Sequence, residues 1–177
     1  TSRFGSTTSR YGSTYSSNSS NSSSSKPLGY LTPLNIALTN NNYQIVKMLI
    51  QSPHLEINEY ANGKTALHLA VIKDNLKILS LLLSSPQIDV NLITQAKGVS
   101  LDDNDPYLDG QNALHIAVQL HRNQVVKELL QKDDLLINER TSLTDPKYRS
   151  RINNQYANGC TALYIACSEN QADIVSL

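Results

Sequence analysis

Two short segments carry residue types that bind phosphate or metal ions. Gly63-Lys64-Thr65 matches the end of a phosphate-binding loop, G-x-x-x-x-G-K-T, but Asn58 occupies the position of its first glycine. The run Asp102-Asp103-Asn104-Asp105 offers oxygen ligands to calcium. Tyr107 and Leu108, however, stand where an EF-hand needs its third ligand and its glycine. We therefore expect neither a nucleotide site nor an EF-hand here.

The histidines and cysteines lack the partners that catalysis or metal binding requires. No acid, base or nucleophile converges in sequence on His68 or His115. Cys160 and Cys167 are separated by roughly 9 Å along a helix, which is beyond disulfide reach and favours a reducing compartment. We expect Cys167 to lie on a buried helix face and Cys160 to be more exposed. The sequence thus predicts no catalytic residue, no metal ligand and no cofactor.

A four-residue phrase recurs along the chain and sets its organisation. It begins at positions 32, 65, 112 and 161, so the first interval is 33 residues and the next two are 14 and 16 residues longer. The copies are Thr32-Pro33-Leu34-Asn35, Thr65-Ala66-Leu67-His68, Asn112-Ala113-Leu114-His115 and Thr161-Ala162-Leu163-Tyr164. A period of this size predicts stacked units of secondary structure, with additional residues looped out between some of them. Such an array presents an extended contact surface rather than a closed catalytic cleft.

Each unit is expected to contain two short helices. The first residue of each phrase is Thr or Asn, which can cap the start of a helix, and Pro33 is tolerated at the first helical position. Nine residues after each cap stands a residue type that tolerates the left-handed backbone conformation. These residues are Asn41, Asp74, His121 and Asn170. They predict a tight turn that leads into a second helix.

The phrase belongs to a longer pattern, T-P/A-L-H-x-A, then I-V-K-x-L-L and a closing D-V-N. It is carried by Thr65-Ala66-Leu67-His68-Leu69-Ala70, Ile45-Val46-Lys47-Met48-Leu49-Ile50 and Asp89-Val90-Asn91. In this pattern the chain resembles the ankyrin repeat family, from about Leu28 to Leu177. The resemblance implies an all-α solenoid of antiparallel helix pairs joined by β-hairpin fingers. It also implies that the histidines of the phrase hydrogen-bond within and between units.

The resemblance divides the chain into a tail and an array. Residues 1–27 form the tail and residues 28–177 the array. The predicted repeats cover about 30–61, 62–93, 108–140 and 157–177, with insertions at about 94–107 and 141–156. Tyr30 replaces the glycine expected before the first phrase, which is compatible with an end cap. Because the chain lacks an initiator Met and the last unit stops inside its second helix, we expect a fragment of a longer protein.

The insertions fall in two consecutive fingers of opposite charge. Loops of this length are usually functional or disordered. One interpretation is that the fingers bind a partner. The other is that neighbouring fingers neutralise each other, through exposed ion pairs that contribute little stability. The candidate contact residues are Asp102, Asp103, Asp105, Tyr107, Lys147, Tyr148, Arg149 and Arg151.

Two smaller signals add candidate sites. Ile72 and Leu120 lie at the ends of first helices, bordering the concave face of an ankyrin-like array, where they either contact a partner or are ordinary surface apolar residues. The tail is rich in Ser, Thr and Asn and is expected to be disordered. An arginine precedes Ser6 and another precedes Ser13 by three residues, so these serines are candidate phosphorylation sites unless the tail is a plain linker.

The charge balance and the lengths of the apolar runs limit the classes of partner that we expect. Beyond the tail the chain has 12 basic and 15 acidic residues, which offers no electrostatic reason for nucleic-acid binding. No apolar run approaches the ~20 residues that span a bilayer. We expect protein partners, no small-molecule substrate and a cytoplasmic or nuclear location. The expected function is a non-catalytic scaffold or adaptor module of a larger intracellular protein. Two alternatives stay open: a regulatory or substrate-recruiting segment of an enzyme such as a kinase, ubiquitin ligase or bacterial effector, and an inhibitor of a transcription factor.

Overall fold

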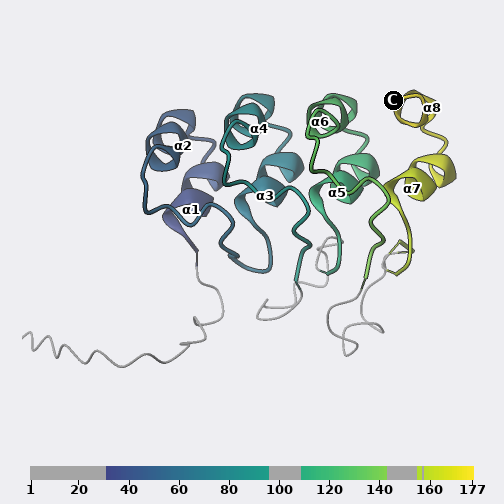
Figure 1. Cartoon of the computed structure of the whole chain (residues 1–177), viewed down its shortest axis with the longest axis horizontal. Helices are drawn as coiled ribbons and strands as arrows, with labels where there is room; N and C mark the ends of the chain where they lie inside the picture. The colour runs from purple at the N-terminus through teal and green to yellow at the C-terminus, as the bar shows by residue number, and fades with distance from the viewer. Residues whose placement is uncertain (1–30, 96–108, 143–154, 157) are drawn as a thin grey trace, which may run out of the picture.

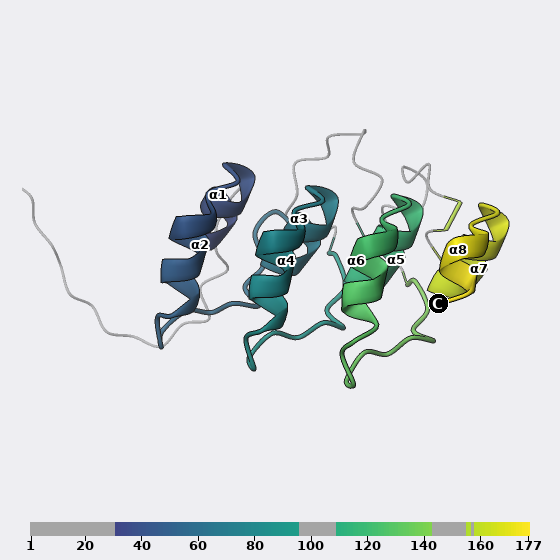
Figure 2. The same ribbon diagram turned by 90° about the horizontal axis from the view of Figure 1, so that it is seen from above.

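The computed structural model describes residues 31–95, 109–142, 155–156 and 158–177, and these residues form four helix pairs (Figure 1). The odd-numbered helices make one row and the even-numbered helices a second row beside it. Seen from above, the pairs follow one another in a line (Figure 2). The helices are α1 (Pro33–Thr39), α2 (Tyr43–Ile50), α3 (Ala66–Ile72), α4 (Leu76–Leu83), α5 (Ala113–Gln119), α6 (Asn123–Leu129), α7 (Ala162–Ser168) and α8 (Ala172–Val175). The predicted all-α solenoid is confirmed.

Side-chain caps begin the first helices where the sequence places them. The Thr32 hydroxyl accepts a hydrogen bond from the Asn35 backbone N–H at 3.1 Å. The Asn112 side-chain oxygen Oδ1 accepts a hydrogen bond from the His115 backbone N–H at 3.0 Å. Each bond satisfies one of the N–H groups that a helix start leaves without an intrahelical partner, so the phrase defines where the helix begins.

The residue nine positions after each cap turns the chain back on itself. All four residues in this slot have a φ of 55°, in the left-handed region. They are Asn41, Asp74, His121 and Asn170. The predicted tight turns are therefore confirmed, and they make each second helix run antiparallel to the first.

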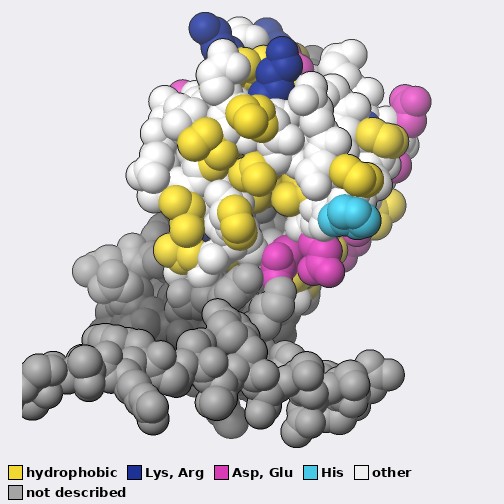
Figure 3. Space-filling model, turned by 90° about the vertical axis from the view of Figure 1, so that its left-hand side faces the viewer, with side chains coloured by type: hydrophobic (Ala, Val, Ile, Leu, Met, Phe, Trp, Pro, Cys, Tyr) yellow, Lys and Arg dark blue, Asp and Glu magenta, His cyan; other side chains and the backbone are white. Residues whose placement is uncertain are grey.

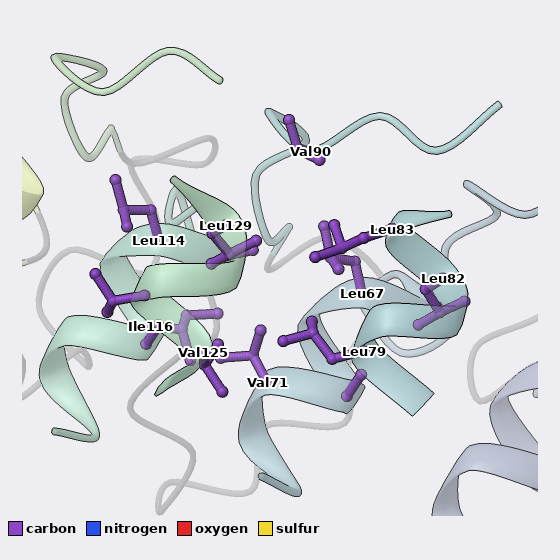
Figure 4. Packing of buried hydrophobic residues seen from close by; sticks show 14 of the residues in the cluster. Leu67, Val71, Leu79, Leu82, Leu83, Val90, Leu114, Ile116, Val125 and Leu129 are labelled. Atoms are coloured by element: carbon purple, nitrogen blue, oxygen red, sulfur yellow. The ribbon is translucent and has the colours of Figure 1, made fainter. Parts of the chain in front are cut away.

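One apolar core runs through all four pairs. Each helix has at most eight residues, too few to bury its own apolar face, so neighbouring pairs cover one another. Figure 4 shows Val71 and Leu79 of the second pair gathered with Ile116 and Val125 of the third, in the space between the two pairs. All four side chains are at most 1% exposed.

The fingers are closed by single β-bridges in the described residues rather than by full strands. Ala61 pairs with Lys64, Ile93 with Asn112 and Arg140 with Thr161. The Ala61 N–H donates to the Lys64 carbonyl at 2.9 Å, the Thr94 N–H to Gln111 at 2.8 Å, and the Thr141 N–H to Cys160 at 2.8 Å. The second and third closures enclose 14 and 16 more residues than the first, so the insertions lie between these closing pairs.

The prediction for the two cysteines was wrong. Cys167 is exposed, and Cys160 is partly buried and packed against the core. Cys167 occupies the slot of Leu38, Val71 and Val118, which are at most 3% exposed because a following helix pair covers them. No described helix pair follows α7 and α8, so the same slot is open there.

Candidate functional site

The turns between the helices form one continuous edge of the array. We call this the turn edge and define it as residues 39–42, 72–75, 119–122 and 168–171. Most of its side chains are exposed, and they include amides, acids, bases and an imidazole. It is therefore a surface that can present different polar groups at regular intervals.

Neighbouring units are joined along the turn edge by the residue that follows each left-handed turn. Asn75 does two things: its side-chain oxygen caps α4 by accepting from the Ile78 N–H at 3.0 Å, and its amide nitrogen donates to Asn41 of the preceding unit. In the third unit Arg122 holds this slot and forms a 3.0 Å ion pair with Asp74. The same slot thus links successive turns through different chemistry.

In the fourth unit the residue in this slot is buried, and it bonds to the backbone of the third unit. Gln171 is 8% exposed, and its amide nitrogen donates to the Val118 carbonyl at 2.9 Å. Beside it the turn edge has a polar hollow of about 320 Å³ between the third and fourth turns. The hollow is lined by His121, Asn123 and residues 169–173. It can accept a polar side chain.

The phrase histidines are structural groups. The His115 Nδ1 accepts from the Asn112 backbone N–H at 3.4 Å, and its Nε2 lies 3.1 Å from the Glu139 carbonyl oxygen, to which it donates. In the second unit the Thr65 backbone N–H donates to the His68 Nδ1 at 3.1 Å, which is the equivalent bond. His115 therefore bonds within its unit and to the following finger, as the family resemblance implies.

Burial keeps both rings neutral. It lowers the pKa of His68 to about 4, and it lowers the pKa of His115 although the Glu139 carbonyl opposes the shift. A neutral ring fits the contacts, because Nδ1 must have a free electron pair to accept from a backbone N–H. The contacts of both histidines in the described residues are therefore structural.

A family model described as "Ankyrin repeats (3 copies)" matches residues 14–94 and 90–177. The chain belongs to the ankyrin repeat family.

The fold is also similar to a solved ankyrin structure. The crystal structure of the ankyrin repeat domain of Bcl-3, titled a unique member of the IkappaB protein family, superposes with a TM-score of 0.58 and 24% sequence identity. The match covers 82% of this chain and 54% of that chain, so this array spans about half of its length. At this identity the likeness shows the fold alone. No curated protein matches the sequence.

Within the ankyrin array, Ile72 and Leu120 are only partly exposed. Both pack against the core, and both lie on the turn edge. The structure therefore places them where a partner could touch them, beside the more exposed Lys73 and His121. Their role as contact residues stays a prediction.

The other candidate contact residues lie outside the described residues. This applies to the acidic finger residues Asp102, Asp103, Asp105 and Tyr107, to the basic finger residues Lys147, Tyr148, Arg149 and Arg151, and to Ser6 and Ser13 of the tail. Their roles also stay predictions.

Two charged residues at the bases of the fingers lie within the described residues, and the fold itself accounts for their positions. Asp109 lies at the base of the first finger and is only 3% exposed. The Arg140 guanidinium donates to the Gly159 carbonyl at 2.8 Å across the base of the second finger. Asp109 and Arg140 are therefore weaker candidates for partner contacts than an exposed charge without such surroundings.

A tyrosine stands five residues before three of the four ankyrin phrases. The Tyr60 hydroxyl donates to the Ile93 carbonyl at 2.9 Å, which connects the first finger to the second. Tyr156 is 7% exposed, and its hydroxyl donates to Glu169 at 2.5 Å. Tyr107 is the third member of this series. Its register with two structural tyrosines weakens the case for Tyr107 as a partner contact.

Sequence reasoning missed the role of the asparagine that closes each repeat. Asn58 donates to the Gln87 carbonyl at 2.7 Å and accepts from the Asp89 N–H at 3.0 Å. Asn91 repeats both bonds one unit later, with the Asp134 carbonyl and the Leu136 N–H, each at 2.8 Å. The signal was the recurrence of Asn after an apolar residue at the end of each unit.

We looked in the described residues for a phosphate-binding loop, a metal site and a membrane-spanning helix. Gly63-Lys64-Thr65 forms the turn and base of the first finger rather than a strand–loop–helix, because Lys64 bridges Ala61. Within the described ranges, His, Cys, Asp and Glu side chains do not gather in threes as a metal site would need. In the same ranges, every helix is too short to span a bilayer.

Proposed function

We propose that this ankyrin array is a non-catalytic module through which a larger intracellular scaffold or adaptor protein binds other proteins. Ankyrin repeats indicate a protein–protein interaction module. The observation that carries the proposal is that the turn edge differs in chemistry from unit to unit, while the positions beneath it repeat.

Two positions of the repeat, one buried and one on the turn edge, illustrate this difference. The slot five residues after each cap is alanine in every unit and is at most 4% exposed. The slot eight residues after each cap lies on the turn edge and carries an amide, a cation, an aliphatic chain and an anion. Its members are Asn40, Lys73, Leu120 and Glu169. Repeated packing fixes the spacing of these side chains, and their variety supplies specificity for one partner.

The charge distribution supports a protein partner. The chain beyond the tail is slightly acidic, and Lys73 and Arg122 on the turn edge stand beside Asp74, so no basic stripe follows the described edge. The proposal includes the two fingers as a second contact region, with the residues named above. An enzyme-regulating role and inhibition of a transcription factor remain alternatives for the whole protein.

Site-specific photo-crosslinking tests the proposal. A photoreactive amino acid is placed at Lys73 on the turn edge, and separately at Lys127, another exposed lysine, which lies on α6 away from the turns. After illumination in cell lysate, we expect a discrete covalent adduct with another protein from position 73 and none from position 127. Adducts from both positions alike, or from neither, would contradict the turn edge as the binding surface.

A deletion variant separates the fingers from the turn edge. Residues 96–108 and 143–154 are removed, and circular dichroism checks that the helical content is retained. If the adduct at position 73 persists, the turn edge binds without the fingers. If it disappears while the helices remain, the fingers supply the essential contacts and the candidate finger residues are tested singly.

A further inference from the structure

The polar hollow on the turn edge lies between the third and fourth units. It has a volume of about 320 Å³ and is lined by His121 and Asn123 of the third unit and by residues 169–173 of the fourth. Figure 3 shows the other end of the array, where hydrophobic side chains gather on the first helix pair, which follows residues that the structure does not describe. The hollow has a described unit on each side, so it does not depend on where the sequence begins or ends.

The hollow occurs where the link between neighbouring turns is missing. Asn75 donates to the turn residue of the first unit, and Arg122 pairs with Asp74 of the second. In the fourth unit Gln171 holds this slot, but its amide nitrogen donates to a backbone carbonyl inside the array. Among the described residues no side-chain hydrogen bond therefore joins the third turn to the fourth, and the space between them stays open.

The wall of the hollow is acidic. Glu169 and Asp173 line it and are both exposed, whereas Lys and Arg are absent from its lining. One Glu169 carboxylate oxygen accepts from the Tyr156 hydroxyl at 2.5 Å, which holds this side chain in place. Within the described residues the Asp173 carboxylate has no hydrogen bond or ion pair. Two carboxylates without a basic side chain between them favour a cation at this place.

A buried carbonyl group adds to the negative potential of the wall. Gln171 lines the hollow and is 8% exposed. Its amide nitrogen is used in the bond to Val118, and its Oε1, which lies beneath the surface, has no hydrogen-bond partner among the described residues. A buried acceptor without a donor is uncommon in folded proteins. A ligand with several N–H groups would supply the missing donor.

We propose that the hollow binds the guanidinium group of an arginine that belongs to the protein partner of this array. The inference rests on the proposed function, and it names the chemistry that the partner brings to the turn edge. A guanidinium has five N–H donors in a planar fork, which suits two carboxylates and a carbonyl oxygen better than the three donors of a lysine do. The array itself contains this pairing one junction earlier, between Arg122 and Asp74.

The size of the hollow limits what it can hold. A volume of about 320 Å³ is at the lower end of the range for ligand sites, which suits one side chain rather than a folded segment. A single exposed ion pair contributes little affinity. The arginine therefore sets specificity: an acidic side chain is repelled by the two carboxylates, and an apolar one leaves them and the Gln171 oxygen without partners.

Two-dimensional NMR of the isotopically labelled chain tests the proposal, with N-acetyl-arginine amide as the probe. N-acetyl-citrulline amide has nearly the same shape and no charge, so it is the control ligand. We expect the arginine probe to shift the backbone amide signals of residues 169–173 in a saturable way, with a Kd of about 1–10 mM. The citrulline probe should leave these signals unchanged.

Two double variants separate the hollow from the net charge of the chain. Glu169→Gln with Asp173→Asn removes both carboxylates of the hollow. Glu128→Gln with Asp133→Asn removes the same charge from exposed residues that do not line it. The first variant should bind the arginine probe about tenfold more weakly, and the second should bind it within about twofold of the wild type. The dispersion of each spectrum shows that the variant is folded.

Several results would overturn the proposal. These are the absence of saturable shifts at residues 169–173 up to about 50 mM of the arginine probe, equal shifts with the citrulline probe, and full binding by the hollow variant. Equal binding of N-acetyl-lysine amide would overturn the choice of arginine.

The photo-crosslinking experiment at position 73 distinguishes this inference from the proposed function. If a discrete adduct forms but the arginine probe does not bind, the turn edge binds a protein and the arginine site is wrong. If the probe binds but no adduct forms, the proposed function is wrong, and with it the protein partner as the source of the arginine.

Discussion

Arg122 of the third unit and Asp74 of the second form a 3.0 Å ion pair between two neighbouring turns of the array. Asp74 is a left-handed turn residue, and Arg122 replaces the asparagine that caps the second helix in the two preceding units. In this unit the helix start lacks a side-chain cap, and an ion pair to the preceding unit takes its place.

Replacing Arg122 by asparagine should therefore stabilise the array or leave its stability unchanged. The new amide can accept from the Val125 N–H, a cap that contributes about 1 kcal/mol. The ion pair that is lost is exposed and contributes about 0–1 kcal/mol. Arg122→Ala loses the pair without gaining the cap, so it should be less stable than Arg122→Asn by about 1 kcal/mol. Urea denaturation of the two variants measures the difference, and equal midpoints would show that no cap forms.

Gly110→Ala should destabilise the array more than Gly159→Ala. The two glycines have similar positive φ values, 71° and 78°, so alanine meets about 1–2 kcal/mol of backbone strain at either position. A methyl group on Gly110 would also lie 1.5 Å from the Ser142 carbonyl oxygen, whereas nothing lies within 4 Å of one on Gly159. The clash should add about 1–3 kcal/mol. Thermal melts of both variants compare their stabilities directly. An equal loss of stability in both would mean that Ser142 can move away from residue 110 at little cost.

Stability should fall as the pH drops below the ordinary histidine pKa. The folded pKa of His68 is about 4 and its usual value is 6.5, so between these values the unfolded chain binds the proton more readily. The neutral ring's contribution is complete above pH 6.5 and is lost as the pH falls towards 4. The full penalty is on the order of 3 kcal/mol. His68→Asn, which copies Asn35 in the first unit, should flatten urea-derived stability between about pH 6.5 and 5. An unchanged pH profile in the variant would contradict this assignment.

Asn91→Ala should destabilise the array, and Asn138→Ala should have little effect. Asn91 makes two hydrogen bonds to the loop of the following unit, worth about 1–2 kcal/mol together. Asn138 holds the same slot one unit later and is exposed. The two variants remove the same side chain, so chemical denaturation isolates the inter-unit bonds. A loss of similar size in both would show that the asparagine acts within its own unit.

The local features of this fold were predictable because they depend on neighbours in the sequence. A cap at Thr32 and a left-handed turn at Asp74 each follow from residues within a few positions, and both are confirmed. The hydrogen bonds of His115 were implied only by the family resemblance. The same local logic identified the repeat. The partner contacts were less predictable, because most candidate residues lie in the fingers and the sequence does not say what faces them.

What only the tertiary structure decided is which side of each helix pair is covered. Val118 and Cys167 share a slot, and so do Ile116 and Ile36, yet one member of each pair is buried and the other is exposed. The sequence by itself determined that these slots face a neighbouring unit. Whether a neighbour is present depends on the stacking of units far apart in the chain. Whether a side chain is buried therefore depends on the arrangement of the units and not on the residue type alone.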